Sequence, residues 1–146
     1  MKIFRIALII IVSTTLFSKN LQQSYLEANL PNSFEEFNKI LQRDLVTYFS
    51  IKFKKPVIVK YNLLRDRPTQ SGVAYPKFYA WINIYDSNKL IETGAIRVAS
   101  IDKVRIEVTD YITQSKILLN PNLIESIFPR PLCNNIRDRA KFNKQH

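Results

Sequence analysis

The spacing of the apolar residues changes at Pro56, and this change limits the folds that the chain can adopt. Before Pro56, apolar residues recur at intervals of three, four and seven between Phe34 and Phe49, which is the pattern of one helix face. Ser33 and Glu36 form a capping-box pattern at the start of this segment, and Pro56 prevents the helix from continuing. We therefore predict one long helix that begins after Ser33.

After Pro56 the apolar residues alternate with polar ones, which is the pattern of strands with one wet face. In the last alternating segment Val104, Ile106 and Val108 are expected to face the core. Short turns between successive strands favour an antiparallel meander. Short helices are expected nearer the C-terminus. The four predicted strands cover residues 57–64, 77–85, 90–101 and 103–109.

This order predicts an α+β domain, in which one long N-terminal helix packs on a curved four-stranded antiparallel sheet and short helices follow. The arrangement resembles the cystatin-like group of folds, which includes the nuclear transport factor 2-like proteins. The resemblance covers about residues 33–109 and is one of topology only. Cystatin inhibitors carry a Gln-x-Val-x-Gly loop, which the segment Thr69-Gln-Ser-Gly-Val73 does not match. Protease inhibition is therefore not expected.

The first 18 residues have the order of a secretory signal. A basic start is followed by the apolar run Ile6–Val12 and by a segment with several small residues that ends at Ser18. The apolar core is shorter than the roughly 20 residues of a spanning helix, which favours a cleaved signal peptide. Leu16 fits a cleavage site poorly, so an uncleaved inner-membrane anchor stays open, as does a buried N-terminal strand. The predicted layout is a leader over 1–18, a linker or arm over 19–32 and one domain over 33–146.

The chain is strongly basic, with 22 Lys and Arg against 12 Asp and Glu and a formal net charge of +10. Such a charge attracts anionic partners, either an acidic protein or a membrane surface. Cys133 is the only cysteine, so the chain has no internal disulfide and must be stabilised by packing. The predicted basic surface falls in two clusters. The first comprises Lys52, Lys54, Lys55, Lys60, Arg65 and Arg67, and the second, nearer the C-terminus, includes Arg137, Arg139 and Lys141.

Residues that support catalysis are scarce. The only histidine, His146, is the last residue, and one histidine with one cysteine excludes an ordinary zinc site. With two glycines the chain has no glycine-rich phosphate loop, so we expect neither a metal nor a cofactor. A small enzyme of the nuclear transport factor 2-like kind would need a cavity lined by Asp66, Asp110 or Tyr61.

The aromatic residues of the second predicted strand form the best candidate for a binding surface. Tyr79, Trp81 and Tyr85 share one face of that strand, next to Lys77. Tyrosine and tryptophan give large contact areas with polar tips, so an exposed face of this kind would bind a partner. The alternative is that the C-terminal helices cover this face.

These observations favour a small exported binding protein of the bacterial envelope that is not an enzyme, such as an immunity or inhibitor protein. A bacterial source is indicated by the basic leader and by the lack of any Asn-x-Ser/Thr sequon. The expected partner is another protein, and nucleic acid is not expected because exported proteins rarely meet it. The first alternative is a membrane-tethered periplasmic component of an envelope or secretion assembly, and the second is the small enzyme described above.

Overall fold

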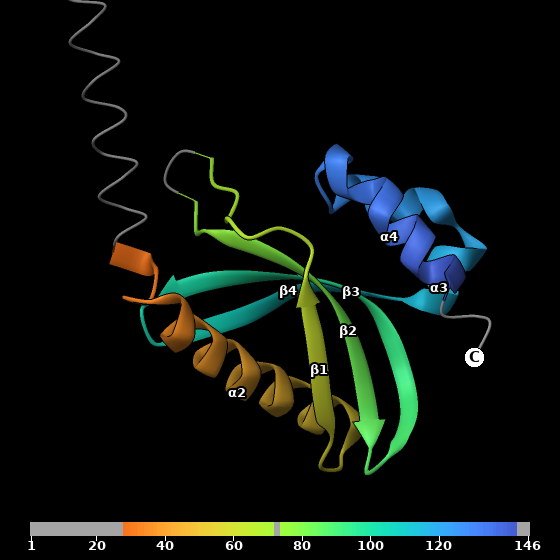
Figure 1. Cartoon of the computed structure of the whole chain (residues 1–146), viewed down its shortest axis with the longest axis horizontal. Helices are drawn as coiled ribbons and strands as arrows, with labels where there is room; N and C mark the ends of the chain where they lie inside the picture. The colour runs from red at the N-terminus through yellow and green to blue at the C-terminus, as the bar shows by residue number, and fades with distance from the viewer. Residues whose placement is uncertain (1–27, 72–73, 143–146) are drawn as a thin grey trace, which may run out of the picture.

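In the computed structural model, which describes residues 28–71 and 74–142, a long helix crosses one face of a four-stranded antiparallel sheet (Figure 1). The strands follow the chain in the order β1-β2-β3-β4, and short helices come last. The predicted α+β class is therefore confirmed. The elements are α2 (Phe34–Phe53), β1 (Ile58–Leu63), β2 (Lys77–Asp86), β3 (Lys89–Asp102), β4 (Arg105–Thr113), α3 (Gln114–Leu119), the 3-10 helix η1 (Pro121–Ser126) and α4 (Arg130–Phe142).

Helix α2 begins as its capping pattern predicts. The Ser33 hydroxyl accepts a hydrogen bond from the Glu36 amide at 3.1 Å, and the Glu36 carboxylate accepts one in return. The donor of that second bond is the amide of Asn32 rather than that of Ser33. At the other end Lys54 adopts a left-handed conformation with φ 55°, and its amide donates to the Ile51 carbonyl. Among the described residues, no helix combines the length and the apolar character that crossing a membrane requires.

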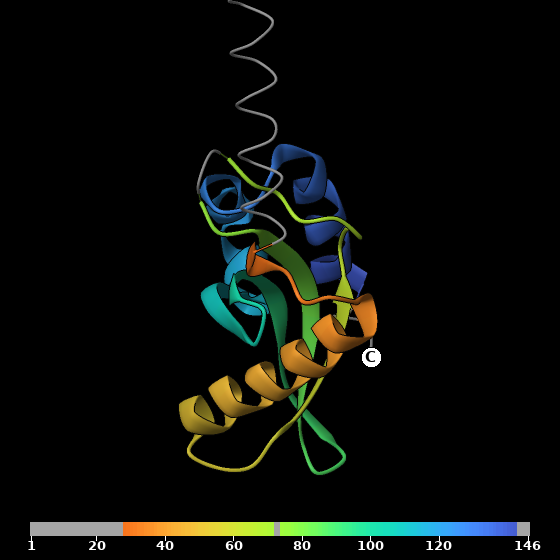
Figure 2. The same ribbon diagram turned by 90° about the vertical axis from the view of Figure 1, so that its left-hand side faces the viewer.

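The two faces of β2 pack against different layers. Figures 1 and 2 show α2 on one side of the sheet and the C-terminal helices on the other. The α2 side buries Phe78, Ala80, Ile82 and Ile84 of β2 together with α2 side chains such as Leu41 and Phe49. The other side buries Tyr79 and Trp81 of β2 together with side chains such as Ile117, Ile124, Cys133 and Ile136. The alternation predicted for this strand is correct, and both of its faces lie in a core.

Cys133 lies inside the second core, as its apolar neighbours suggest. Its side chain is buried, and its sulfur lies 3.7 Å from the carbonyl oxygen of Phe128. Burial raises the pKa of the Cys133 thiol. The neutral thiol is therefore the form that the fold favours.

The structure corrects three predictions. Val104 is 63% exposed rather than buried, because it lies in the turn before β4, where its amide donates to the Asp102 carboxylate. Phe34 and Tyr48, which belong to the predicted apolar stripe of α2, are also exposed.

The third correction concerns the predicted linker over residues 19–32. Asn29 is 8% exposed, and its carbonyl accepts a hydrogen bond of 2.6 Å from the buried Ser100 hydroxyl. Leu30 packs against the core beneath α2. Residues 28–32 therefore belong to the domain. The predicted leader and the rest of the predicted arm lie outside the described residues.

Gly94 allows β3 and β4 to lie close together. A Cβ atom at this position would lie 2.2 Å from the carbonyl oxygen of Ile112 and 2.9 Å from the Cα of Thr113. Both contacts are with backbone, which cannot move aside without breaking the pairing of the two strands.

We expect Gly94→Ala to lower the free energy of unfolding by about 1–3 kcal/mol, because the added methyl group overpacks a backbone contact. Urea unfolding followed by circular dichroism measures this loss. Ser87→Gly is the contrasting variant, since Ser87 has φ 54° and glycine adopts that conformation without strain. It should change the stability by less than about 1 kcal/mol. Equal stability of Gly94→Ala and the parent chain would contradict the close approach.

Candidate functional site

The predicted aromatic surface is largely covered. Tyr79 and Trp81 are only 4% and 3% exposed, and the Tyr79 ring lies 5.9 Å from the ring of Phe128 beyond η1. The prediction that these two residues form an exposed binding face is therefore wrong, because the C-terminal helices cover this part of the sheet. Tyr85 is partly exposed, nearer the β2–β3 turn. Lys77 is partly buried and lines a hollow with Tyr79 and Arg97.

The residues considered for an enzyme site lie apart. The Asp110 carboxylate pairs with the Arg97 guanidinium at 2.6 Å, and Arg97 also donates to the Ile127 carbonyl. Tyr61 packs on the opposite face of the sheet, where its hydroxyl donates to the Asn38 side chain. Asp66 is exposed in the loop after β1. The structure brings these three residues into no common cavity.

The basic residues of α4 take part in contacts within the domain. Arg137 pairs with Glu125 of η1 and also donates to the Pro121 carbonyl. Arg139 donates to Asn62 of β1 at 2.9 Å, which connects α4 to the sheet edge. These two guanidinium groups therefore hold the C-terminal helices in place, whereas Lys141 is exposed.

The basic stretch from Lys52 to Arg67 is divided between two ends of the domain. Strand β1 rises by about 3.3 Å per residue, so it carries Arg65 and Arg67 away from the lysines that precede it. Lys52, Lys54, Lys55 and Lys60 stay near the end of α2, where the β2–β3 turn brings Lys89 beside them. The four lysines of this predicted cluster are exposed, but the cluster itself is divided, because Arg65 and Arg67 lie beyond the other end of β1.

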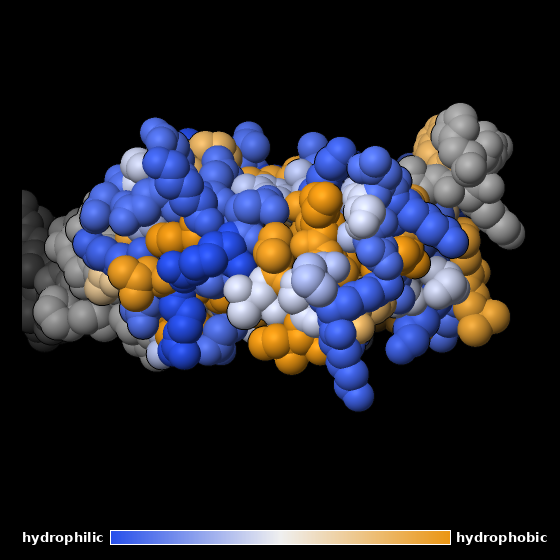
Figure 3. Space-filling model, turned by 90° about the horizontal axis from the view of Figure 1, so that it is seen from below, coloured by the Kyte–Doolittle hydropathy of each residue, from blue (hydrophilic) through white to orange (hydrophobic). Residues whose placement is uncertain are grey.

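This end of the molecule also exposes apolar side chains, and we name it the lysine tip. It combines the end of α2, the start of β1 and the β2–β3 turn. Seen from below in Figure 3, an apolar area lies in the middle of the molecule with polar residues around it. Ile51, Ile58 and Leu90 are 72%, 49% and 46% exposed. The tip consists of Ile51, Lys52, Lys54, Lys55, Pro56, Ile58, Lys60, Tyr85, Asp86, Lys89 and Leu90.

Strand register explains why the apolar residues of the tip meet. Ile58 pairs with Tyr85, and Tyr85 pairs with Leu90, so the three side chains form a row on one face. This is the face that the C-terminal helices cover further along the sheet. The Lys60 ammonium lies 5.1 Å from the centre of the Tyr85 ring, which places a positive charge directly over the row.

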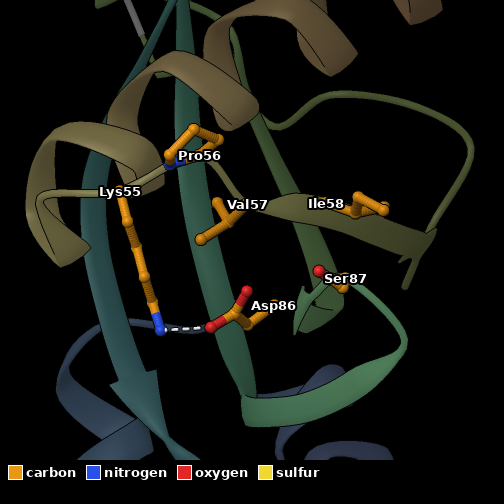
Figure 4. A pocket seen from close by; sticks show the side chains of 6 residues that line it. All are labelled: Lys55, Pro56, Val57, Ile58, Asp86 and Ser87. Carbon is orange, nitrogen blue, oxygen red and sulfur yellow. Dashed lines mark hydrogen bonds and ion pairs between the residues drawn. The ribbon is translucent and has the colours of Figure 1, made fainter.

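A hollow of about 400 Å³ opens beside this row (Figure 4). Its lining includes Val57, Ile58 and Ser87, and across it the Lys55 ammonium pairs with the Asp86 carboxylate at 2.6 Å. Asp86 is the only acidic residue in the tip as defined above. Among the described residues, no carboxylate forms an ion pair with the other tip lysines, Lys52, Lys54, Lys60 and Lys89. The tip is therefore both apolar and strongly positive.

Sequence reasoning found four of the five tip lysines and missed Lys89 and the three exposed aliphatic residues. The signals were present, since the end of the helix at Pro56 and the turn at residues 86–89 were both predicted. An antiparallel meander under a helix places these two points at the same end of the sheet. Combining them would have indicated the tip.

No family model, no curated protein and no solved structure matches this chain. The resemblance to the cystatin-like group therefore stays a prediction about topology.

We expect Trp81→Ala to lower the free energy of unfolding by about 3–5 kcal/mol, because it empties a buried site in the second core. Tyr85→Ala on the same face is the control and should cost much less, since Tyr85 is partly exposed. Urea unfolding must be followed by circular dichroism, because Trp81 is the only tryptophan and its fluorescence is lost in the variant. Similar losses in the two variants would contradict the covered aromatic face.

Proposed function

We propose that the protein is a small exported binding protein of the bacterial envelope, without a catalytic role, and that it binds an anionic partner through the lysine tip. The observation that carries this proposal is the joint exposure, at one end of the domain, of aliphatic side chains and of lysines that have no acidic partner among the described residues. Solvated lysines alone would be a common surface feature. Lysines around exposed aliphatic residues favour a docking surface instead.

The proposal that the protein has no catalytic role is supported by the use of the polar residues elsewhere. Arg97 and Asp110 connect the sheet to the C-terminal helices, and Tyr61 connects β1 to α2. Each of the three is therefore engaged in a contact that supports the fold. Among the described residues, no group of three histidine, cysteine or acidic side chains could hold a metal ion.

Export itself rests on the sequence of the first 18 residues. The leader pattern favours release after cleavage, and an uncleaved leader would make the protein a tethered periplasmic component. The lysine tip would be the docking surface in either form. Intact mass and fractionation of the protein from its host distinguish the two.

Site-specific photo-cross-linking in the host tests the docking surface. A photoreactive amino acid at position 90 replaces an exposed leucine of the tip, and the matched control replaces Leu119, which is 88% exposed at the end of α3. We expect adducts with envelope components from position 90 and few from position 119. Adding Lys54→Ala and Lys89→Ala should reduce the adducts from position 90, because both lysines are exposed tip cations.

Two results would overturn the proposal. The first is equal adducts from the two positions, which would mean that the tip is no more engaged than the rest of the surface. The second is a cytoplasmic location for the adducts, which would contradict export.

A further inference from the structure

We infer that the lysine tip docks on the surface of a lipid bilayer rich in anionic phospholipid. This inference rests on the proposed function and names the partner of the same surface. Three observations support this inference. The cations of the tip are all lysines, its exposed apolar part is small, and its positive charge would repel the same surface of a second copy.

The cations of the tip are all lysines. Lysine carries a compact charge on a flexible stem, which suits attraction to a fluid layer of headgroups better than fixed pairing. Three arginines have a different role, since Arg97, Arg137 and Arg139 make directed bonds to carboxylates, carbonyls and amides inside the domain. Lys55 pairs with Asp86, and the ammonium groups of Lys52 and Lys60 lie over the rings of Tyr111 and Tyr85. Among the described residues, no carboxylate forms an ion pair with Lys54 or Lys89, so these two exposed charges can attract headgroups without a defined partner geometry.

The apolar part of the tip is small: Ile51 lies in the last turn of α2, Ile58 begins β1 and Leu90 lies near the start of β3. A stable protein interface buries about 800 Å² on each partner, with roughly 20–30 residues a side. The tip as defined has eleven residues, fewer than such an interface uses. Docking in the headgroup region of a bilayer needs only a few apolar side chains that enter it and cations that stay at its surface. Ile51, Ile58 and Leu90 can enter in this way, with the lysines around them.

A second copy of the chain is a poor occupant. Two facing tips would place Lys54 and Lys89 of one chain against the same lysines of the other, with Asp86 already paired to Lys55 in each. Like charges brought together in an interface oppose association. An anionic lipid surface supplies the opposite charge without any such conflict.

Vesicle co-sedimentation of the chain purified from its host tests the inference. One set of vesicles contains phosphatidylcholine alone, and the other contains equal parts of phosphatidylcholine and phosphatidylglycerol. We expect binding to the anionic vesicles, weakened as the salt concentration rises because salt screens the lysines. Lys54→Ala with Lys89→Ala should weaken binding by about 25-fold, from about fivefold for each lysine.

Matched variants separate the tip from the rest of the surface. Arg65→Ala with Arg67→Ala removes the same charge from exposed residues beyond the other end of β1, and should change binding far less. Ile58→Ser with Leu90→Ser should weaken binding at unchanged net charge, whereas Leu119→Ser should leave it unchanged. All variants change exposed residues, and circular dichroism verifies that each is folded.

Three outcomes would overturn the inference. Equal binding to both kinds of vesicle would remove the role of anionic lipid. Binding that depends on the lysines but not on Ile58 and Leu90, and that free polyphosphate competes away, would assign the tip to a soluble phosphate polymer. Lack of vesicle binding together with a protein adduct from position 90 would assign the tip to an acidic protein, and the proposed function would then stand without this inference.

Discussion

The structure depends on a sheet that is apolar on both faces and therefore needs two covers. Along β2, Phe78, Ala80 and Ile82 face α2, while Tyr79 and Trp81 face the C-terminal helices. The helices that cover the two faces differ in length, since α2 has 20 residues and the C-terminal helices are shorter. The second face is buried at Trp81 but exposed at Ile58 and Leu90. The lysine tip is the part of the sheet that the shorter cover does not reach.

Positive charge is distributed according to residue type. Arg97 and Arg139 connect the C-terminal helices to the sheet through directed hydrogen bonds, and Arg137 connects α4 to η1. A planar guanidinium group suits this role because it can donate to several acceptors at once. The lysines of the tip lie beyond the C-terminal helices, and only Lys55 has an acidic partner among the described residues. Part of the positive charge of the chain therefore supports the fold, through Arg97, Arg137 and Arg139, and another part lies exposed on the lysines of the tip.

Local patterns in the sequence predicted the elements well and the exposed surfaces less well. The cap at Ser33 and the alternation of β2 are local signals, and both are observed. The sequence could not show whether the Trp81 face is open, because an apolar strand face looks the same whether it binds a partner or an internal helix. Lysines close in sequence were separated from Arg65 by the length of β1, and Lys89 joined them only through strand pairing. Which residues lie together at the tip thus depends on contacts distant in sequence.

The burial of Cys133 has a consequence for the redox chemistry of the chain. Thiol–disulfide exchange needs an accessible thiolate, and here burial both hides the sulfur and raises the pKa of the thiol. An odd cysteine at the surface would invite cross-linking to foreign thiols in an oxidising compartment. The Cys133 sulfur lies among Phe128 and the side chains of α4, so it is protected from reaction as long as the C-terminal helices stay packed on the sheet. Oxidation of the Cys133 thiol would therefore indicate that the C-terminal helices had moved away from the sheet.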